Sequence, residues 1–258
     1  MGWDTMIGIS EELDAAIDKG VEKGWLLLDL GVMPYGEVWE FQHQVVAAKV
    51  EGRISANIFM LLEHEPVFTL GRRGQREHLL VSEHFLDAQG VPVIHVERGG
   101  DITYHGPGQV VGYPIVDLRQ IGWKVVKFVE ALEEVMIYTV ADFGIKAERN
   151  PLNRGIWVGP EKLGSVGITV RHGITFHGFA LNVNLSMEPF SWIHPCGLRD
   201  VRMTSMKQVL GQELDMESVR SSIRRHMERI FGVELEKLPL HSAQRTYFDS
   251  IYRGNGSV

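Results

Sequence analysis

The sequence has very little cysteine: Cys196 is the only one in 258 residues. A single thiol excludes an internal disulfide framework and is typical of a protein in a reducing compartment. No stretch reaches the roughly 18 apolar residues that a membrane-spanning helix needs. The opening residues, MGWDTMIGISEELDAA, are acidic where a secretory signal is basic and then apolar. We therefore expect a cytoplasmic protein with no membrane partner.

The sequence also lacks a surplus of basic residues. Its formal net charge of -7 argues against a general nucleic-acid binder, because such proteins need positive charge to neutralise phosphates. Two local arginine groups stand out: GRRGQREH at residues 71–78, and Arg220, Arg224, Arg225 and Arg229 along one predicted helix. Each group is either a solvated face or a docking surface for an acidic partner.

Familiar cofactor motifs are missing as well. There is no G-x-x-x-x-G-K-[ST] phosphate loop, and GPGQVVG at residues 106–112 has the wrong glycine spacing for a dinucleotide fingerprint. The 11 histidines lack the spacing of a metal-binding motif. We expect neither a metal nor a cofactor.

Periodicity predicts an irregular alternation of strands and helices. Residues 25–31 form an apolar strand, residues 56–71 a buried strand and its return, and residues 156–185 an antiparallel meander. Two further strands flank a glycine-rich turn at residues 99–108. Because this order differs from a strict βαβ alternation, it favours an α+β fold with a mixed, largely antiparallel sheet.

Helical spacing of apolar residues predicts helices over residues 35–52, about 123–143 and 216–231, with more helix near 203–211 and 242–252. An added helix precedes the first strand, with Ser10 as its N-cap. We therefore divide the chain into an N-terminal helical extension, residues 1–24, and one domain, residues 25–258.

Four segments carry residues suited to chemistry. They are RGGDITYHGPGQ at 98–109, KLGSVGI at 162–168, HGFALNV at 177–183 and HPCGL at 194–198. Each also has a purely structural explanation, since glycine turns join strands and a lone lysine is usually a surface charge. Cys196 by itself is either a small buried filler or a nucleophile.

Taken together, and with LLEHEPVFTLGRRG before them, these segments closely resemble the bacterial lipoyl(octanoyl) transferases of the biotin/lipoate protein ligase superfamily. The resemblance runs from about Trp25 to the last helix. One departure is Ser165, where alanine is commoner. The resemblance implies a mixed sheet flanked by helices with a small second sheet. It also implies an enzyme that needs no cofactor. We expect a monomer, although no motif in the sequence specifies the oligomeric state.

The implied activity is the first step of endogenous protein lipoylation. An octanoyl or lipoyl group passes from acyl carrier protein to a lysine of a lipoyl domain through a cysteine thioester. The implied acceptors are the lipoyl domains of 2-oxoacid dehydrogenase complexes and the glycine cleavage H protein. A thioester is already activated, so its conversion to an amide requires no ATP.

The resemblance also implies roles for individual residues. Cys196 and Lys162 form the catalytic dyad. His105 and His177 are suited either to hydrogen-bond the acyl carbonyl or to brace the loops, so His177 is a supporting residue. The residues implied in acyl binding are Arg98, Gly99, Gly100, Asp101, Ile102, Thr103, Tyr104, His105, Ser165, Val166, Gly167, Gly178, Phe179 and Ala180. A free thiol has a pKa of about 8.5, and a nearby ammonium favours the thiolate. Lys162 is therefore suited to activate Cys196 and to accept a proton from the attacking amine.

Three other functions are compatible with parts of this pattern. An ATP-dependent lipoate ligase shares the fold but has no use for the cysteine of HPCG. An amidotransferase that takes octanoate from the glycine cleavage H protein would use the same dyad and differ in its donor. A non-catalytic acyl-binding or carrier-docking module would not need the thiol at all.

Overall fold

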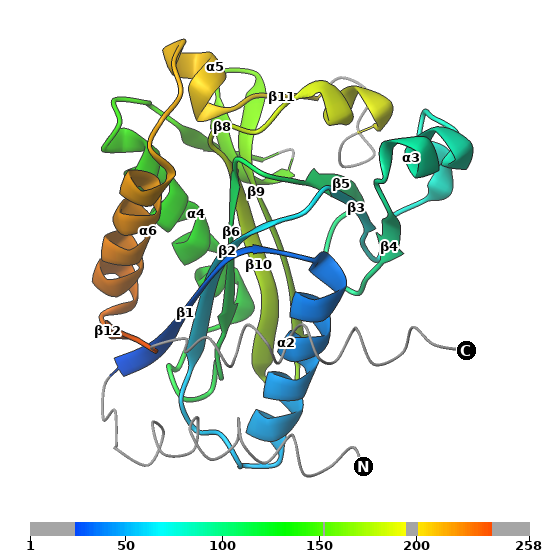
Figure 1. Ribbon diagram of the computed structural model, residues 1–258. Coiled ribbons are helices and arrows are strands. Elements are labelled where there is room, and N and C mark those ends of the chain that lie inside the picture. The colour runs from blue at the N-terminus through cyan, green and yellow to red at the C-terminus, as the bar shows by residue number, and fades with distance from the viewer. Residues whose placement is uncertain (1–23, 152, 195–200, 239–258) are drawn as a thin grey trace, which may run out of the picture.

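The computed structural model describes residues 24–151, 153–194 and 201–238 (Figure 1). Its helices are α2 (Tyr35–Val50), α3 (Glu83–Gln89), α4 (Val125–Ala141), α5 (Met206–Leu210) and α6 (Met216–Phe231), with the 3-10 turns η1 (Arg76–His78) and η2 (Glu188–Trp192). Its strands are β1 (Gly24–Met33), β2 (Ile58–His64), β3 (Val67–Leu70), β4 (Val93–His95), β5 (Ile102–His105), β6 (Gln109–Ile115), β7 (Glu148–Asn150), β8 (Asn153–Val158), β9 (Glu161–Arg171), β10 (Ile174–Asn182), β11 (Arg202–Met203) and β12 (Glu234–Lys237).

The strands form one large sheet and one small sheet. The large sheet has the order β12-β1-β2-β6-β10-β9-β8-β7, with β11 beside β9, and the small sheet has the order β4-β3-β5. In the large sheet β1 runs parallel to β2 and β12, and β11 runs parallel to β9, whereas the other neighbours are antiparallel. The predicted α+β fold with a mixed, largely antiparallel sheet and a small second sheet is confirmed.

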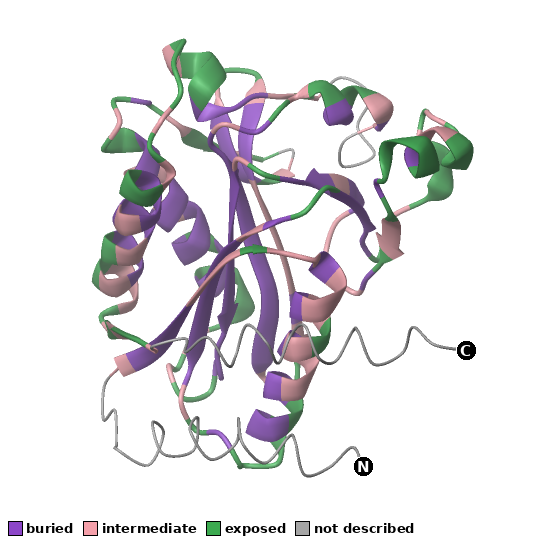
Figure 2. Cartoon of the chain, in the orientation of Figure 1, coloured by how far each residue is buried: buried purple, intermediate pink, exposed green. Residues whose placement is uncertain are grey.

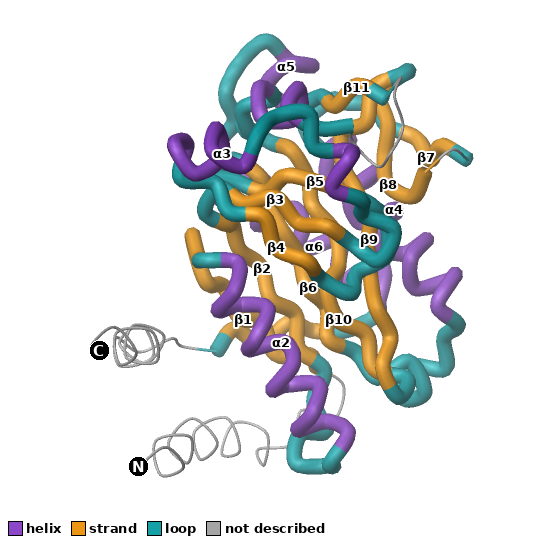
Figure 3. The backbone as a smooth tube through the Cα atoms, turned by 90° about the vertical axis from the view of Figure 1, so that its right-hand side faces the viewer, coloured by secondary structure: helices purple, strands orange, loops and turns teal. Residues whose placement is uncertain are grey.

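Helices cover both faces of the large sheet. Helix α2 lies across one face, and α4 and α6 pack together against the other (Figures 1 and 3). The central strands are almost wholly buried, and exposed residues lie on the outward sides of the helices (Figure 2). None of the helices in the described ranges is long and apolar enough to cross a membrane.

Helix α6 shows how local sequence determines an element. The Asp215 side chain accepts a hydrogen bond from the Ser218 backbone N–H at 2.9 Å, and Gly232 ends the helix with a left-handed φ of 66°. Val219, Ile223 and Met227 repeat every four residues and are fully buried against the core. Burial of each such side chain stabilises the fold by about 1.5–3 kcal/mol. The helix predicted over residues 216–231 is confirmed.

The arginines of α6 contact acidic residues of the same chain. Arg220 and Arg224 donate to Asp29 of β1, and Arg225 donates to Asp142 after α4. The Arg229 guanidinium lies 4.7 Å from the centroid of the Tyr138 ring. These contacts join α6 to the sheet edge and to α4, so they account for the arginine pattern without an acidic partner.

Two predictions about the strands are wrong. Strand β3 is not the return of β2: it pairs with β4 and β5 in the small sheet, while β2 pairs with β1 and β6. Pro66 lies between them and favours extended chain before it, so the backbone continues instead of reversing. The predicted glycine-rich turn contains a strand, β5, whose four residues are too few to show a clear alternation.

Some predictions cannot be compared with the structure. The predicted helices near Ser10 and over residues 242–252 lie outside the described residues, as does Cys196. Gly24, which we assigned to the extension, is the first residue of β1.

Candidate active site

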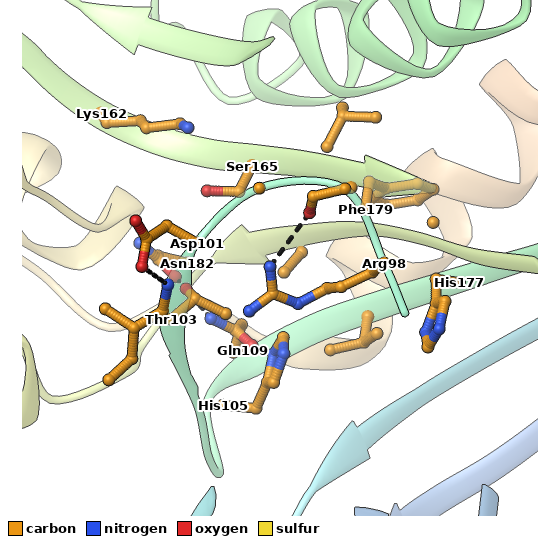
Figure 4. Close-up of a pocket in the computed structure, with 18 of the residues that line it drawn as sticks. Arg98, Asp101, Thr103, His105, Gln109, Lys162, Ser165, His177, Phe179 and Asn182 are labelled. Carbon is orange, nitrogen blue, oxygen red and sulfur yellow. Dashed lines mark hydrogen bonds between the residues drawn. The ribbon is translucent and has the colours of Figure 1, made fainter. Parts of the chain in front are cut away.

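The predicted acyl-binding segments meet around one cavity, here called the inner pocket. Its walls are the loop before β5, the middle of β9 and the facing part of β10 (Figure 4). The predicted residues that line it are Arg98, Gly99, Gly100, Asp101, Ile102, Thr103, His105, Lys162, Ser165, Val166, Gly167, His177, Gly178, Phe179 and Ala180. Segments separated by some 60 to 80 positions thus share one site.

Tyr104 is the predicted binding residue that does not line the inner pocket. Its ring packs 5.2 Å from Phe68 and 5.9 Å from Phe190, measured between ring centroids, in the core beneath the small sheet. Successive residues of a strand point to opposite faces, so Thr103 and His105 reach the pocket while Tyr104 points away.

Strand pairing sets two of the predicted segments face to face. In the β9–β10 ladder Ser165 pairs with Ala180, and Gly167 pairs with Gly178. A Cβ atom on Gly178 would collide with the Gly112 carbonyl oxygen, and one on Gly167 would lie 2.9 Å from the Gly99 carbonyl oxygen. Glycine is therefore required where these backbones approach one another.

Lys162 lies on β9 with its residue only 1% exposed. Its Nζ donates to Asn153 Oδ1 at 2.7 Å and lies 5.7 Å from the centroid of the Trp157 ring. A buried amine needs such acceptors, because burial of an unpaired charge is costly. We did not predict Asn153. Nothing in its own sequence context identifies it, although a buried lysine implies an oxygen acceptor nearby.

Arg98 holds the glycine-rich loop against the small sheet. It donates to the Thr69 carbonyl oxygen at 2.6 Å, to Thr69 Oγ1 at 2.8 Å and to the Gly99 carbonyl oxygen at 3.1 Å. These bonds fix the first residues of the loop that forms the pocket wall. Arg98 therefore shapes the pocket as well as lining it.

Asp101 fixes the same loop from its other end. One carboxylate oxygen, Oδ1, accepts from the Ile102 backbone N–H at 2.6 Å and lies 2.9 Å from His78 Nδ1. His78 also binds the chain near Cys196, because its carbonyl oxygen accepts a hydrogen bond from the His194 backbone N–H at 2.8 Å. His194, the first residue of HPCGL, is thus anchored beside the loop that lines the inner pocket.

A second group of buried polar side chains forms or backs the wall of the pocket. Figure 4 shows Lys162 and His177 at opposite ends, with Arg98 between them. His105 Nδ1 is 2.7 Å from Gln109 Oε1, whose Nε2 in turn donates to Asn182 Oδ1 at 2.9 Å. His64 Nε2 lies 2.7 Å from the Tyr113 hydroxyl, directly behind. The hydrogen bond of His105 to Gln109 is a bracing contact.

These buried histidines are uncharged at neutral pH. Burial lowers the pKa of His64 to about 4, although its bond to the Met33 carbonyl opposes the shift. Burial, followed by repulsion from His64, holds the pKa of His105 well below its usual value. Burial also lowers the pKa of His177, against the attraction of Glu97, whose Oε2 is 3.7 Å from His177 Nε2. This part of the pocket wall is therefore polar but carries no histidine cation.

The arrangement places an apolar wall close to a reactive amine. Apolar side chains of Val111, Val166 and Phe179 line the pocket, and the amine of Lys162 lies at one end. The described residues contain no group of acidic, histidine or cysteine side chains placed to hold a metal ion. The chemistry that fits is a reaction at the head of a bound acyl chain, next to Lys162.

Comparison with known proteins agrees with this fold and site. The lipoyl protein ligase A/B catalytic domain matches residues 34–228. Among solved structures, lipoate-protein ligase A bound with ATP superposes with a TM-score of 0.69 at 13% identity, over 89% of this chain and 94% of that one. An archaeal bipartite lipoate protein ligase from Thermoplasma acidophilum gives a TM-score of 0.67 at 14% identity, over 90% of this chain and 92% of that one. At these identities the structures establish the fold.

Sequence relatives define the branch of the family. The octanoyltransferase of Desulfotalea psychrophila is 44% identical over 220 residues, which are 84% of this chain and 99% of that protein. The octanoyltransferase of Syntrophobacter fumaroxidans is 44% identical over 205 residues, which are 80% of this chain and 90% of that protein. The chain therefore belongs to the octanoyltransferases of the lipoyl protein ligase A/B family.

Proposed function

We propose that this octanoyltransferase moves an octanoyl group from acyl carrier protein to a lysine of a lipoyl domain, with Cys196 as the nucleophile and Lys162 as its basic partner. The observation that carries the proposal is the buried amine of Lys162, held by Asn153 at one end of a pocket whose wall includes Val111, Val166 and Phe179. The identity to the octanoyltransferases supports the same reaction.

The first half-reaction forms an acyl-enzyme. The Cys196 thiolate attacks the thioester carbonyl, the bond from that carbon to the carrier's sulfur breaks, and the carrier leaves as a thiol. The proton of Cys196 passes through Lys162 to the leaving sulfur. Because one thioester replaces another, this step is close to balanced in energy and needs no ATP.

The second half-reaction forms the amide. The neutral amine of the acceptor lysine attacks the thioester on Cys196, the carbon–sulfur bond breaks, and Lys162 takes the proton that the amine loses. The amide product is more stable than the thioester. The acceptors are lipoyl domains, including those of 2-oxoacid dehydrogenase complexes and the glycine cleavage H protein, so we expect the enzyme to work in the cytoplasm.

The acyl chain would lie along the inner pocket. Each buried methylene contributes about 0.8 kcal/mol, so the seven carbons beyond the carbonyl supply several kcal/mol of binding. The exposed loop that contains Arg72 and Arg73 is suited to contact an acidic carrier protein. That contact predicts a Michaelis constant for the carrier that rises with salt.

The proposal is tested by mixing the purified full-length chain with octanoyl-acyl carrier protein and an unmodified lipoyl domain, without ATP. We expect octanoylated lipoyl domain, and we expect Cys196→Ala to abolish its formation while the protein stays folded. Lys162→Ala should also lose activity severely.

Other outcomes would redirect the assignment. Transfer that requires ATP and free octanoate would identify a ligase. Transfer from octanoylated H protein alone would identify an amidotransferase. Normal turnover by Cys196→Ala would contradict the nucleophilic role.

A further inference from the structure

A second cleft, here called the outer cleft, adjoins the inner pocket and has no role in the reaction described so far. It has a volume of about 570 Å³. Its walls are formed by Arg73, Gly99, Gly100, Val129, Asn150, Pro151, Asn153, Arg154, Val166, Gly167 and Ile168. Gly99, Gly100, Asn153, Val166 and Gly167 also line the inner pocket, so the two spaces share a wall.

Asn153 places the outer cleft at the reacting end of the inner pocket. Its Oδ1 accepts from Lys162 Nζ at 2.7 Å, and the same residue lines the outer cleft. His177, at the other end of the inner pocket, does not line the outer cleft (Figure 4). A molecule in the outer cleft therefore has one end beside the proposed catalytic amine.

The walls of the outer cleft combine three kinds of group. Val129, Ile168 and Pro151 are apolar, and the side chains of Asn150 and Asn153 are amides. Arg73 and Arg154 add two guanidinium groups from different segments of the chain. This combination suits a ligand that is apolar in part, contains amides and carries a negative charge.

Arg154 is suited to receive such a charge. Its side chain is 50% exposed, and its Nη1 lies 3.4 Å from Glu133 Oε2. Glu133 also accepts from Arg149 Nε at 3.1 Å and from the Gly155 backbone N–H at 2.9 Å. Because Glu133 keeps these two donors, Arg154 can turn toward an anion without leaving that carboxylate unpaired.

We infer that the outer cleft binds the phosphopantetheine arm of the thioester donor, with the phosphate beside Arg73 and Arg154. This inference rests on the proposed function, in which a carrier protein delivers the acyl group. The arm is a long chain with two amides, a branched apolar segment and a phosphodiester, and its sulfur must reach the reacting end of the inner pocket. An acceptor lysine is a much shorter chain and brings no phosphate.

The test compares two small donors that differ only in the phosphate: octanoyl-4'-phosphopantetheine and octanoyl-pantetheine. The rate of acyl-enzyme formation is measured for the full-length chain without an acceptor. We expect the phosphorylated donor to react about tenfold more efficiently, which is typical of one charge-assisted hydrogen bond. Arg73→Gln and Arg154→Gln should each reduce this ratio, with the rate for octanoyl-pantetheine unchanged.

Two matched variants serve as controls. Arg154→Lys retains the positive charge and should retain most of the preference. Arg53→Gln removes an exposed arginine that pairs with Glu51 and does not line the cleft, and it should leave the ratio unchanged.

The contrary results are distinct. Equal rates for the two donors in the unaltered chain, or an unchanged ratio in both glutamine variants, would overturn the inference. Reaction with octanoyl-acyl carrier protein but with neither small donor would also contradict it. If the glutamine variants form the acyl-enzyme at the unaltered rate but transfer it more slowly to a lipoyl domain added afterwards, the cleft binds the acceptor and not the donor arm. Failure to form any acyl-enzyme, even from octanoyl-acyl carrier protein, would refute the proposed function itself.

Discussion

Removal of the side-chain oxygen of Asn153 should slow catalysis far more than it destabilises the fold. In the structure this oxygen accepts from Lys162 Nζ at 2.7 Å, and Lys162 is 1% exposed. Asn153→Ala removes the acceptor and leaves a small space beside the amine. The amine then loses one of the contacts that hold it at the end of the inner pocket.

The expected magnitude follows from the type of bond. A hydrogen bond to a charged group contributes about 1.5–3 kcal/mol. Since each 1.4 kcal/mol corresponds to a factor of ten in rate, the variant should form the acyl-enzyme about 10- to 100-fold more slowly. The loss should appear in the maximal rate at saturating donor, because the reacting amine is displaced even when donor is bound, and the Michaelis constant for the donor should also rise because Asn153 lines both cavities.

The assay is a rapid-quench measurement of acyl-enzyme from octanoyl-acyl carrier protein, at saturating donor and without acceptor. Asn57→Ala is a suitable control, because Asn57 Oδ1 accepts from the Asp117 backbone N–H at 3.0 Å in a buried site away from the pocket. That control should lower the free energy of unfolding and leave the maximal rate intact. A folded Asn153→Ala protein with the unaltered rate would refute a positioning role for this bond.

Three further predictions concern stability and chain length. His64 has a pKa of about 4 in the folded state and about 6.5 when unfolded, so the unfolded chain binds more protons below pH 6.5. The free energy of unfolding should therefore keep its full value above pH 6.5 and fall by about 3 kcal/mol as the pH is lowered to 4. Denaturant titrations of His64→Gln at several pH values should show a shallower decline, and an unchanged decline would contradict the assignment. Ser165 lines the inner pocket, so Ser165→Leu should shorten the space for the acyl chain and shift donor preference from octanoyl toward shorter chains, by about fourfold per methylene. Ser165→Ala should leave the preference unchanged. An unchanged chain-length profile in Ser165→Leu would show that this position does not limit the length of the chain. Gly178→Ala should lower the melting temperature, because its new methyl group meets the Gly112 carbonyl oxygen, and an unchanged value would contradict that contact.

Elements with a strong local signal could be predicted from the sequence. Helix α6 was predicted with its observed ends because the repeat of Val219, Ile223 and Met227 lies within one segment. The meander of β8, β9 and β10 was predicted for the same reason, since its turns and alternation are local. The sequence could not show to which sheet β3 belongs. Strand β3 pairs with β4 and β5, and this pairing depends on the packing of residues far apart in the chain.

The candidate site was predicted in its segments but not in all its contacts. Glycine-rich loops and the lysine segment identified the walls of the inner pocket before their pairing was known. Tyr104 was included with the rest of its segment by resemblance, and the structure packs its ring against Phe68 instead of along the inner pocket. Asn153 was missed because its importance depends on the position of Lys162 across the β8–β9 hairpin, which is a property of the fold.

The most direct test of the account is intact-protein mass spectrometry of the full-length chain after incubation with octanoyl-acyl carrier protein, without ATP and without acceptor, followed by peptide mapping. We predict one octanoyl group on the peptide that contains Cys196, and we expect that group to disappear from the peptide when an unmodified lipoyl domain is added. Octanoyl transfer without such an adduct, or an adduct on another residue that discharges to the lipoyl domain, would contradict the thioester route through Cys196.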